Sequence, residues 1–333
     1  MINELEIHNF KSIKDLTLPC KRFNLFIGEP NTGKSNILEA LGLVSFIGVR
    51  QYDPDAKLDG FVRHRQLVSI FHDQKIDWPL TVRVDQNEVE LAYRDGQYCC
   101  TLLDPVGEIV TTLVGDQLKA VNTSDRPIRF DPPVSFYRGP AVDGFIYHPG
   151  PCLLPPDGRN LPALMAKDSE LRSYGELLMA PNGLPGYRLS VESAKGQISL
   201  TRKVADGREF TLPYSMTSES IQRLIFFSAM LESNRNTALV LENPEAGIFP
   251  EDAKILAEQI ALDESDNQYF IGTQDNAFVM SLFCKAPIDA IAINIVYRED
   301  YDTRIRSLGP AELQELWELD LLFNLERYLE DNE

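Results

Sequence analysis

The sequence predicts an α/β fold, and three features of the 333-residue chain lead to this prediction. A short apolar run at 23–27 precedes a glycine-containing loop, and apolar residues at helical spacing follow over 37–44. A second apolar run, at 238–241, ends in Glu242, which is typical of a buried parallel strand at its carboxyl end. Between these halves, residues 51–211 contain short alternating runs separated by turn residues. We therefore expect a core of parallel strands and helices that carries a β-rich insertion.

The loop from Gly28 to Ser35 is a complete G-x-x-x-x-G-K-[ST] motif. A strand, a glycine loop and a helix in this order direct backbone N–H groups and the positive end of the helix at a polyphosphate. Lys34 is expected to reach the β- and γ-phosphates, and Ser35 is expected to ligate Mg²⁺. The alternative is a turn without a ligand, but a turn does not require Lys-Ser after its second glycine. The residues of this half expected to contact nucleotide are Gly28, Asn31, Thr32, Gly33, Lys34, Ser35 and Asn36.

The composition limits the partners and the compartment. The chain has 50 acidic and 32 basic residues, for a formal net charge of −18. Nucleic acid repels such a chain at long range, so DNA binding would be weak unless a local basic patch or a partner supplies the contact. No apolar run reaches the ~18 residues that cross a bilayer, and the N-terminus lacks the order of a signal peptide. The five cysteines form no C-x-x-C pair. We expect a cytoplasmic protein without membrane contact.

The segments around the glycine loop resemble a known family. These segments are Leu5-x-Ile7-x-Asn9-Phe10-Lys11-Ser12-Ile13, Asn24-Leu25-Phe26-Ile27-Gly28 and Gly33-Lys34-Ser35-Asn36-Ile37-Leu38-Glu39-Ala40-Leu41. They resemble the opening of RecF/SMC/OLD-type ATPases, the ABC-like branch of the AAA-family ATPases, which includes stand-alone members without a nuclease domain. The resemblance implies a P-loop NTPase fold of the ABC-ATPase head type that uses ATP and Mg²⁺. It makes Lys11 a candidate neighbour of the phosphates or the base, although a solvated lysine on an edge strand explains this residue as well.

Residues 51–211 are expected to form the β-rich insertion. Prolines between 149 and 162 predict a loop, and a helix is predicted at 168–179. No sustained heptad repeat occurs, so the long coiled coil of SMC-type members is not expected. The stretch 153–161 lies either close to the nucleotide or is only structural.

A capped helix is predicted to begin near Ser218, because Ser and Thr precede it and Glu219 suits the positive first turn. Its position resembles the ABC signature motif, with Ser218-Glu219-Ser220 in place of a Ser-x-Gly core. The resemblance implies that Ser218 donates to the γ-phosphate of ATP held by a second copy. Ser220 replaces the glycine that allows close backbone approach. The alternative is a well-capped core helix without a ligand.

The segment 238–250 resembles the family stretch that carries two acids followed by Pro-Glu-Ala. The resemblance implies that Glu242 holds Mg²⁺, directly or through water. The second acid, which polarises the attacking water, is replaced by Asn243, and an amide can orient water but cannot accept its proton. Glu245 is either a substitute base or only a helix N-terminal acid. In the next strand, Gln274 occupies the place of a histidine and can still donate to a γ-phosphate oxygen.

The candidate residues therefore divide by role. The catalytic candidates are Lys34, Glu242, Asn243, Glu245 and Gln274, and the metal candidates are Ser35 and Glu242. Groups for binding phosphate and metal are all present, while Asn243 and Gln274 both depart from the family at positions that serve hydrolysis. The glutamine that would contact the metal from the Q-loop is either Gln51 or Gln66.

Four parts are expected along the chain: an N-terminal ATPase half at 1–50, the β-rich insertion at 51–211, a C-terminal ATPase half at 212–309 and an acidic C-terminal helix at 310–333. The last part carries eight acidic residues and one basic residue over 311–333. Leu313, Trp317, Leu321, Leu325 and Leu329 recur at i, i+4, which predicts a helix from about Pro310. This helix either packs on the core or forms a docking surface for a basic partner.

The expected function is a slow or partner-stimulated ATPase that forms a homodimer or higher homo-oligomer over ATP. In this family such a protein drives a separate effector, such as a nuclease, in DNA repair or anti-phage defence. The resemblance covers about 2–48 and 213–297, and the 36 residues after Tyr297 are too few for a nuclease module. The alternative is an ATP-binding switch or assembly module that does not hydrolyse ATP. A P-loop kinase would not explain the acid stretch 242–246.

Overall fold

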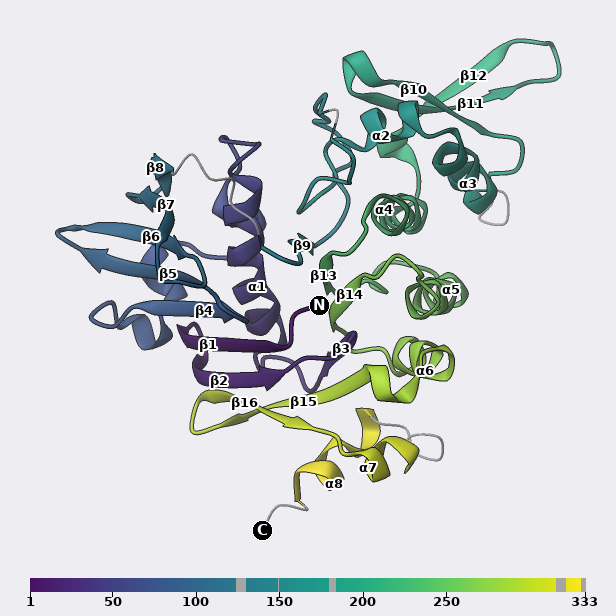
Figure 1. The fold of residues 1–333 in the computed structure, drawn as a ribbon. Helices are drawn as coiled ribbons and strands as arrows, with labels where there is room; N and C mark the ends of the chain where they lie inside the picture. The colour runs from purple at the N-terminus through teal and green to yellow at the C-terminus, as the bar shows by residue number, and fades with distance from the viewer. Residues whose placement is uncertain (124–129, 149, 180–183, 316–321, 331–333) are drawn as a thin grey trace.

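The computed structural model describes residues 1–123, 130–148, 150–179, 184–315 and 322–330. These residues form three β-sheets and the helices that pack on them (Figure 1). The central sheet has six strands in the order β16-β15-β3-β14-β13-β9, and every neighbouring pair is parallel except β15 and β16. Its strands are β3 (Phe23–Ile27), β9 (Val134–Tyr137), β13 (Ala238–Glu242), β14 (Gln268–Gly272), β15 (Ile291–Glu299) and β16 (Asp302–Ser307).

Both faces of the central sheet are covered, because every residue of β3, β13 and β14 is buried. Successive side chains of a strand point to opposite faces. Accordingly, Leu239 and Leu241 of β13 belong to one hydrophobic cluster, while Val240 belongs to the other. The first cluster includes helices α4 (Glu219–Ser233), α5 (Pro250–Ala261) and α6 (Asn276–Lys285), and the second includes α1 (Lys34–Val49). The continuous apolar runs in the sequence are explained by this double burial.

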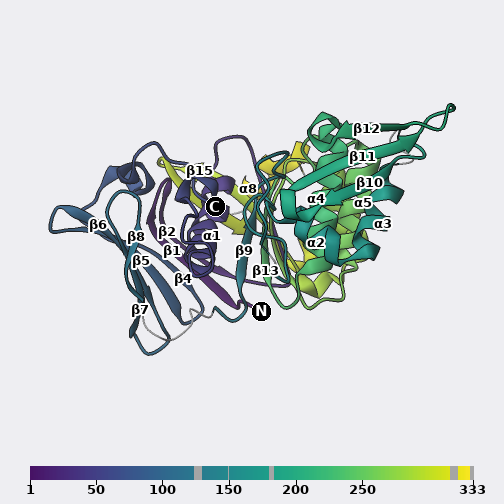
Figure 2. The same cartoon turned by 90° about the horizontal axis from the view of Figure 1, so that it is seen from above.

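A seven-stranded antiparallel sheet lies on the α1 side, in the order β2-β1-β4-β5-β6-β7-β8 (Figure 2). One of its faces joins the hydrophobic cluster of α1, so α1 is enclosed between two sheets. Its strands are β1 (Glu4–Phe10), β2 (Ile13–Pro19), β4 (Leu80–Val84), β5 (Asn87–Arg94), β6 (Gln97–Leu103), β7 (Ile109–Val114) and β8 (Lys119–Thr123).

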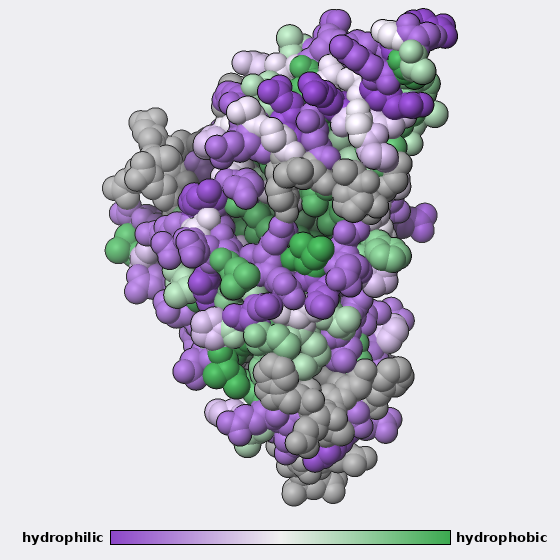
Figure 3. All heavy atoms as spheres, turned by 90° about the vertical axis from the view of Figure 1, so that its right-hand side faces the viewer, coloured by the Kyte–Doolittle hydropathy of each residue, from purple (hydrophilic) through white to green (hydrophobic). Residues whose placement is uncertain are grey.

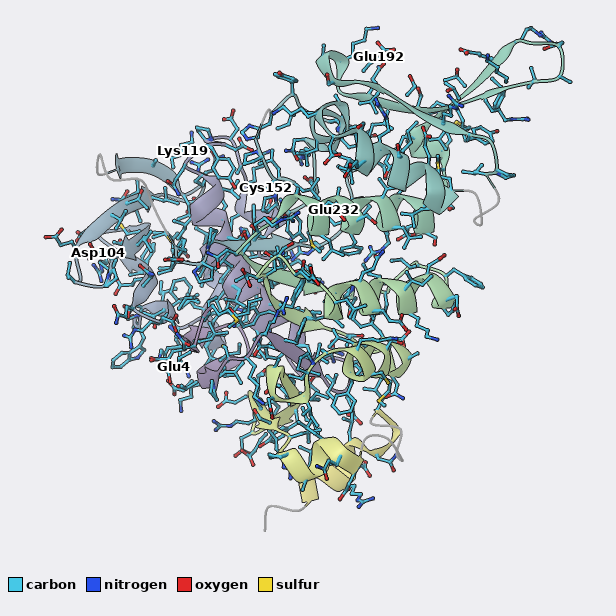
Figure 4. The ribbon with its side chains drawn as sticks, turned by 45° about the vertical axis from the view of Figure 1, so that its right-hand side comes forward. Glu4, Asp104, Lys119, Cys152, Glu192 and Glu232 are labelled. Atoms are coloured by element: carbon cyan, nitrogen blue, oxygen red, sulfur yellow. The ribbon has the colours of Figure 1, made fainter. Side chains whose placement is uncertain are left out.

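A smaller lobe forms at the opposite end of the molecule. It consists of a three-stranded antiparallel sheet, β10-β11-β12, and two helices that pack beside it. Glu192 at the end of β10 and Asp104 after β6 lie on opposite sides of the molecule (Figure 4). The elements of this lobe are α2 (Leu161–Lys167), α3 (Ser169–Met179), β10 (Arg188–Glu192), β11 (Gln197–Lys203) and β12 (Glu209–Pro213).

Residues 51–211 are therefore distributed over all three sheets. Strands β4 to β8 extend the sheet begun by β1 and β2, β9 joins the central sheet beside β13, and β10 to β12 form the small lobe. The helix predicted at 168–179 is confirmed as α3. No helix among the described residues is long and apolar enough to cross a membrane.

The C-terminal part follows β16. Helix α7 (Pro310–Glu315) begins where predicted, and α8 (Leu325–Glu330) follows a short 3₁₀ turn, so two helical segments are described rather than one. Leu313, Leu325 and Tyr328 are buried in the cluster that contains α4 to α6. Trp317 and Leu321 lie outside the described residues.

The molecular face drawn in Figure 3 is mainly hydrophilic with scattered apolar residues.

Candidate nucleotide-binding site

The glycine loop connects β3 to α1 in the order that the sequence predicts. Gly28 has φ 150° and Gly33 has φ 108°, a region that disfavours other residues. A Cβ on Gly28 would lie 2.2 Å from the Val296 carbonyl oxygen, and one on Gly33 would lie 2.0 Å from Thr303 Oγ1. Both glycines are therefore needed for backbone conformation and for close packing against the β15–β16 hairpin.

Lys34 lies inside this loop. Its Nζ donates to the carbonyl oxygens of Gly28 at 2.7 Å and of Glu29 at 2.6 Å, so the loop is wrapped around the ammonium group. Burial lowers the pKa of Lys34 to about 8, although the Glu29 carboxylate opposes this shift. Phosphate oxygens would offer the ammonium stronger acceptors than these carbonyls, because both partners would then be charged.

The first turn of α1 carries the other predicted polar groups. Ser35 is half-buried there, and Asn36 Nδ2 donates to Ser12 Oγ at 2.6 Å. Thr32 Oγ1 donates to the Glu29 carbonyl at 2.9 Å, which closes the loop internally, while Asn31 is exposed with φ 64°. Asn36 and Thr32 therefore hold the shape of the loop in this structure.

Three adjacent strands end at the same level of the central sheet. The register pairs Glu242 of β13 with Gly272 of β14, and Gly272 with Phe26 of β3. The glycine loop starts two residues after Phe26, so the topology brings Glu242 to the edge of the sheet where the loop begins. The carboxyl edge of a parallel sheet is the usual ligand site of such folds.

The Glu242 carboxylate is held by two arginines that the sequence analysis did not identify. Arg63 Nη2 lies 2.5 Å from Oε1, and Arg138 Nε lies 3.0 Å from Oε2. Arg138 directly follows β9, and Arg63 lies in the segment after α1. The position of Arg138 at a strand end is a sequence signal only once β9 is known to belong to the central sheet.

Both arginines also contact Glu39, a fully buried residue of α1. Lys11 Nζ pairs with Glu39 and donates to the Arg63 carbonyl at 2.7 Å. Burial lowers the pKa of Lys11, although Glu39 opposes this effect. Burial also acts to lower the pKa of Arg63, but the Glu242 and Glu39 carboxylates outweigh it and raise that pKa. In this structure Lys11 is therefore paired with Glu39 and is not a solvated lysine.

Glu245 is placed beside the end of β14. Its Oε1 accepts hydrogen bonds from Thr273 Oγ1 at 2.8 Å and from the Gln274 N–H at 3.3 Å. Its Oε2 is buried and has no hydrogen-bond partner among the described residues. Burial raises the pKa of Glu245, which makes its carboxylate a stronger base than an exposed one. Gln274 itself is exposed.

Asn243 adopts a left-handed conformation with φ 45°, which Asn tolerates better than most residues. Its N–H donates to the Gly272 carbonyl at 2.9 Å, and its carbonyl accepts from Arg223 Nη2 at 2.9 Å. The backbone of Asn243 thus joins β14 to helix α4. Asn and Asp adopt this conformation more readily than Glu, which is a structural reason for a short polar side chain here.

Helix α4 begins at the predicted position. Ser218 is its exposed N-cap and accepts from the Ile221 N–H at 3.4 Å. Ser220 Oγ accepts from the Phe249 N–H at 3.2 Å, so it contacts the loop that follows β13. The predicted signature segment and the Glu242 loop are therefore packed together within one chain.

The remaining candidates are Gln51, Gln66 and the stretch 153–161. Gln51 follows the C-terminal end of α1, and a helix of this length separates its ends by about 24 Å at 1.5 Å per residue. Gln66 lies three residues after Arg63 and is exposed. The 153–161 stretch contacts the segment after β9, where the Arg138 N–H donates to the Pro156 carbonyl at 3.1 Å. It therefore lies next to the backbone of Arg138.

The donor set fits Mg²⁺ in a nucleotide complex. The Ser35 hydroxyl and the Glu242 carboxylate are oxygen ligands, and Mg²⁺ commonly takes one or two such ligands together with substrate phosphates and water. Within the described ranges, no group of three His, Cys, Asp or Glu side chains forms a separate metal cluster. Both oxygens of Glu242 are engaged by arginines, so ligation requires that these contacts change.

Comparisons with known proteins agree with this architecture. Residues 1–76 match the family described as AAA ATPase domain. No curated protein matches the chain. A solved Smc head bound to the C-winged helix domain of ScpA is 14% identical, with 93% of this chain and 99% of that chain covered and a TM-score of 0.52. A Smc head with an extended coiled coil, bound to the C-terminal domain of ScpA derived from Pyrococcus furiosus, is 12% identical, with coverage of 95% and 98% and a TM-score of 0.51.

These identities are low, so the structural likeness establishes the fold alone. The chain has the α/β P-loop NTPase fold of ABC-type ATPase heads, and the predicted fold class is confirmed.

Proposed function

We propose that this chain is a Mg²⁺-dependent ATPase whose turnover is slow or stimulated by a partner. The observation that carries the proposal is the meeting of the Lys34 loop, Glu242 and Glu245 at the carboxyl edge of three adjacent parallel strands. A turn without a ligand would not need a buried ammonium wrapped by its own loop.

In this proposal Lys34 exchanges its loop carbonyls for phosphate oxygens, while Ser35 and Glu242 ligate the metal. The first turn of α1 adds backbone N–H groups and the positive end of the helix. Mg²⁺ would neutralise charge on the phosphates when it is bound. The match of residues 1–76 to an AAA ATPase domain supports ATP as the nucleotide.

For hydrolysis we propose Glu245 as the group that accepts the proton of the attacking water. One of its oxygens is oriented by Thr273 and Gln274, and the other is buried without a hydrogen-bond partner in the part of the chain that the structure describes. A base with a raised pKa is better matched to neutral pH. Asn243 can orient the same water but cannot take its proton, which is the reason to expect slow turnover.

We further propose that ATP brings two or more copies together. Ser218 is exposed at the N-terminus of the 15-residue helix α4, which suits donation to a nucleotide held by another copy. The assembly would drive a separate effector, such as a nuclease, in DNA repair or anti-phage defence. With a net charge of −18, direct DNA binding by this chain alone would be weak.

A second candidate is an ATP-binding switch that does not hydrolyse ATP. The specific observation in its favour is that both oxygens of Glu242 are occupied by Arg63 and Arg138, while Asn243 stands in the place of an acid. The two candidates share the binding site and differ in phosphate release.

Calorimetric titration with ATP and MgCl₂ tests the shared premise. Wild type should bind, Lys34→Ala should lose binding, and Lys14→Ala, which removes an exposed lysine of β2, should bind as wild type does. Circular dichroism should give the same spectrum for all three proteins. Binding of Mg-ATP by Lys34→Ala with unchanged affinity would contradict the proposal.

A further inference from the structure

Five charged side chains beside the glycine loop form one connected cluster. We call this cluster the Glu39 network. Its carboxylates are Glu39 of α1 and Glu242 of β13, and its cations are Lys11, Arg63 and Arg138. These residues come from five separate parts of the chain. Glu39 and Glu242 are buried, with side-chain exposures of 0% and 6%, whereas Arg63 is 55% exposed.

Each of the two arginines contacts both carboxylates, with the roles of Nε and Nη2 exchanged between them. Arg63 places Nε 2.6 Å from Glu39 Oε1 and Nη2 2.5 Å from Glu242 Oε1. Arg138 places Nη2 2.9 Å from the same Glu39 oxygen and Nε 3.0 Å from Glu242 Oε2. Each guanidinium therefore bridges both carboxylates, and its planar fork allows this geometry. Glu39 Oε1 is the point that both arginines share.

The charges of the cluster show what each carboxylate does. Three cations face two carboxylates, so a net charge of about +1 lies beside the loop. A buried carboxylate is costly unless it is paired, and Glu39 keeps all three cations as partners even without Glu242. Glu242 is thus the member that can leave the network while the arginines remain held.

We propose that Glu39 is a positioning residue. It holds Arg63 and Arg138 in contact with Glu242, and it keeps both arginines in place when Glu242 ligates the metal. The inference rests on the proposed function, in which Glu242 ligates Mg²⁺. Without nucleotide, the arginines neutralise Glu242. With Mg-nucleotide, Glu242 exchanges its guanidinium contacts for the metal, and Glu39 keeps both guanidiniums in the site as the triphosphate arrives.

This arrangement makes the effect of Mg²⁺ on nucleotide affinity depend on Glu39. When Glu39 is neutral, Glu242 is the one carboxylate of the Glu39 network that still pairs with the two arginines, so freeing it for the metal becomes harder. When Arg63 is neutral, one oxygen of Glu242 is freed and ligation becomes easier. The two changes shift the metal effect in opposite directions, which a role in folding alone would not produce.

The experiment measures the dissociation constant of ATP by calorimetry, once in EDTA and once in MgCl₂, using the full chain. The metal effect is the dissociation constant in EDTA divided by the dissociation constant in MgCl₂, so a larger ratio means that Mg²⁺ strengthens binding more. Glu39→Gln should reduce this ratio by about tenfold, as expected for one charged hydrogen bond. Arg63→Gln should increase it. The control is Glu88→Gln, which breaks an ion pair of 2.5 Å with Arg83 in the antiparallel sheet and should leave the ratio unchanged.

Each outcome decides the proposal. Opposite shifts for Glu39→Gln and Arg63→Gln support it, and a wild-type ratio in Glu39→Gln overturns it. If Glu39→Gln does not fold, Arg63→Gln and Arg138→Gln decide, because Arg63 is half exposed and neither variant removes a buried carboxylate. A ratio that is unchanged or reduced in both then overturns the proposal. A wild type that binds no ATP in either buffer overturns the proposed function, and this inference with it.

Discussion

Thr303 Oγ1 donates a hydrogen bond of 2.9 Å to the carbonyl of Thr32, although 271 positions separate the two residues. Thr303 has one hydroxyl proton, so Ser12 Oγ, at 2.6 Å, must be the donor in its contact with Thr303. Ser12 in turn accepts from Asn36. A chain of hydrogen bonds therefore runs from the first turn of α1, through the β1–β2 turn and the start of β16, back to the glycine loop. The loop is held from outside by both ends of the sequence.

Thr303→Val should weaken nucleotide binding without unfolding the protein. The substitution keeps the shape of the side chain but removes the donor to Thr32, at a cost of about 0.5–1.5 kcal/mol for one hydrogen bond. The Thr32 carbonyl would then be left unsatisfied next to Gly33. Urea unfolding and calorimetry with Mg-ATP measure the two effects. Unchanged affinity would mean that the loop keeps its shape without Thr303.

Glu245→Gln should abolish phosphate release while ATP still binds. Removing a general base costs about 10²–10⁴-fold in rate, or roughly 3–5 kcal/mol of barrier. The amide retains the hydrogen bonds from Thr273 and Gln274 through its carbonyl oxygen, so the loop should keep its fold. A steady-state phosphate assay compares it with wild type. Turnover equal to wild type would exclude Glu245 as the base.

Asn243→Asp should raise turnover with little change in ATP affinity, because it supplies a second proton acceptor near the water. We choose Asp because φ is 45° at this position and Asp tolerates this conformation better than Glu. The comparison uses kcat and the calorimetric affinity of the same preparation. If kcat does not rise although affinity is retained, Asn243 is not what slows the wild type.

ATP should increase the mass of the particle in solution, because Ser218 is exposed and can serve a site on another copy. Light scattering with a non-hydrolysable ATP analogue should show this increase in wild type. Ser218→Arg should remove it by steric conflict, while Thr17→Arg, at an exposed position of β2, should not. A wild type that stays monomeric at saturating nucleotide would contradict assembly of this chain with itself.

Nucleotide affinity should fall as the pH rises above about 8. Burial lowers the pKa of Lys34 to about 8, so its ammonium is charged below that pH and neutral above it. A bound phosphate stabilises the charged form of Lys34. The terminal phosphate has a pKa of about 6, so it does not titrate in this range. Dissociation constants measured from pH 7 to 9.5 should therefore increase. Lys34→Arg keeps its charge throughout, so whatever affinity this variant retains should be independent of pH.

Local sequence patterns were sufficient to predict the strand before the glycine loop, the loop itself and the start of α1. They also located Glu242 at a strand end and Ser218 at a helix cap. Each of these features depends on residues within a few positions of one another, because apolar periodicity, left-handed glycines and capping are local effects. The confirmed helices at 169–179 and 219–233 were predicted for the same reason.

The tertiary structure alone decided how the β-rich middle is divided. Strand β9 has only four residues, and its place beside β13 depends on parallel pairing between residues about a hundred positions apart. The same pairing brings Arg138 to Glu242. Arg63 and Arg138 had no local signal, and the ion pair of Lys11 with Glu39 had none either, because an ion pair is specified by distance in space and carries no periodicity in the sequence. The sequence thus predicted which groups would bind a polyphosphate, and only the packing of distant segments decided which cations hold Glu242, the carboxylate that we propose as a metal ligand.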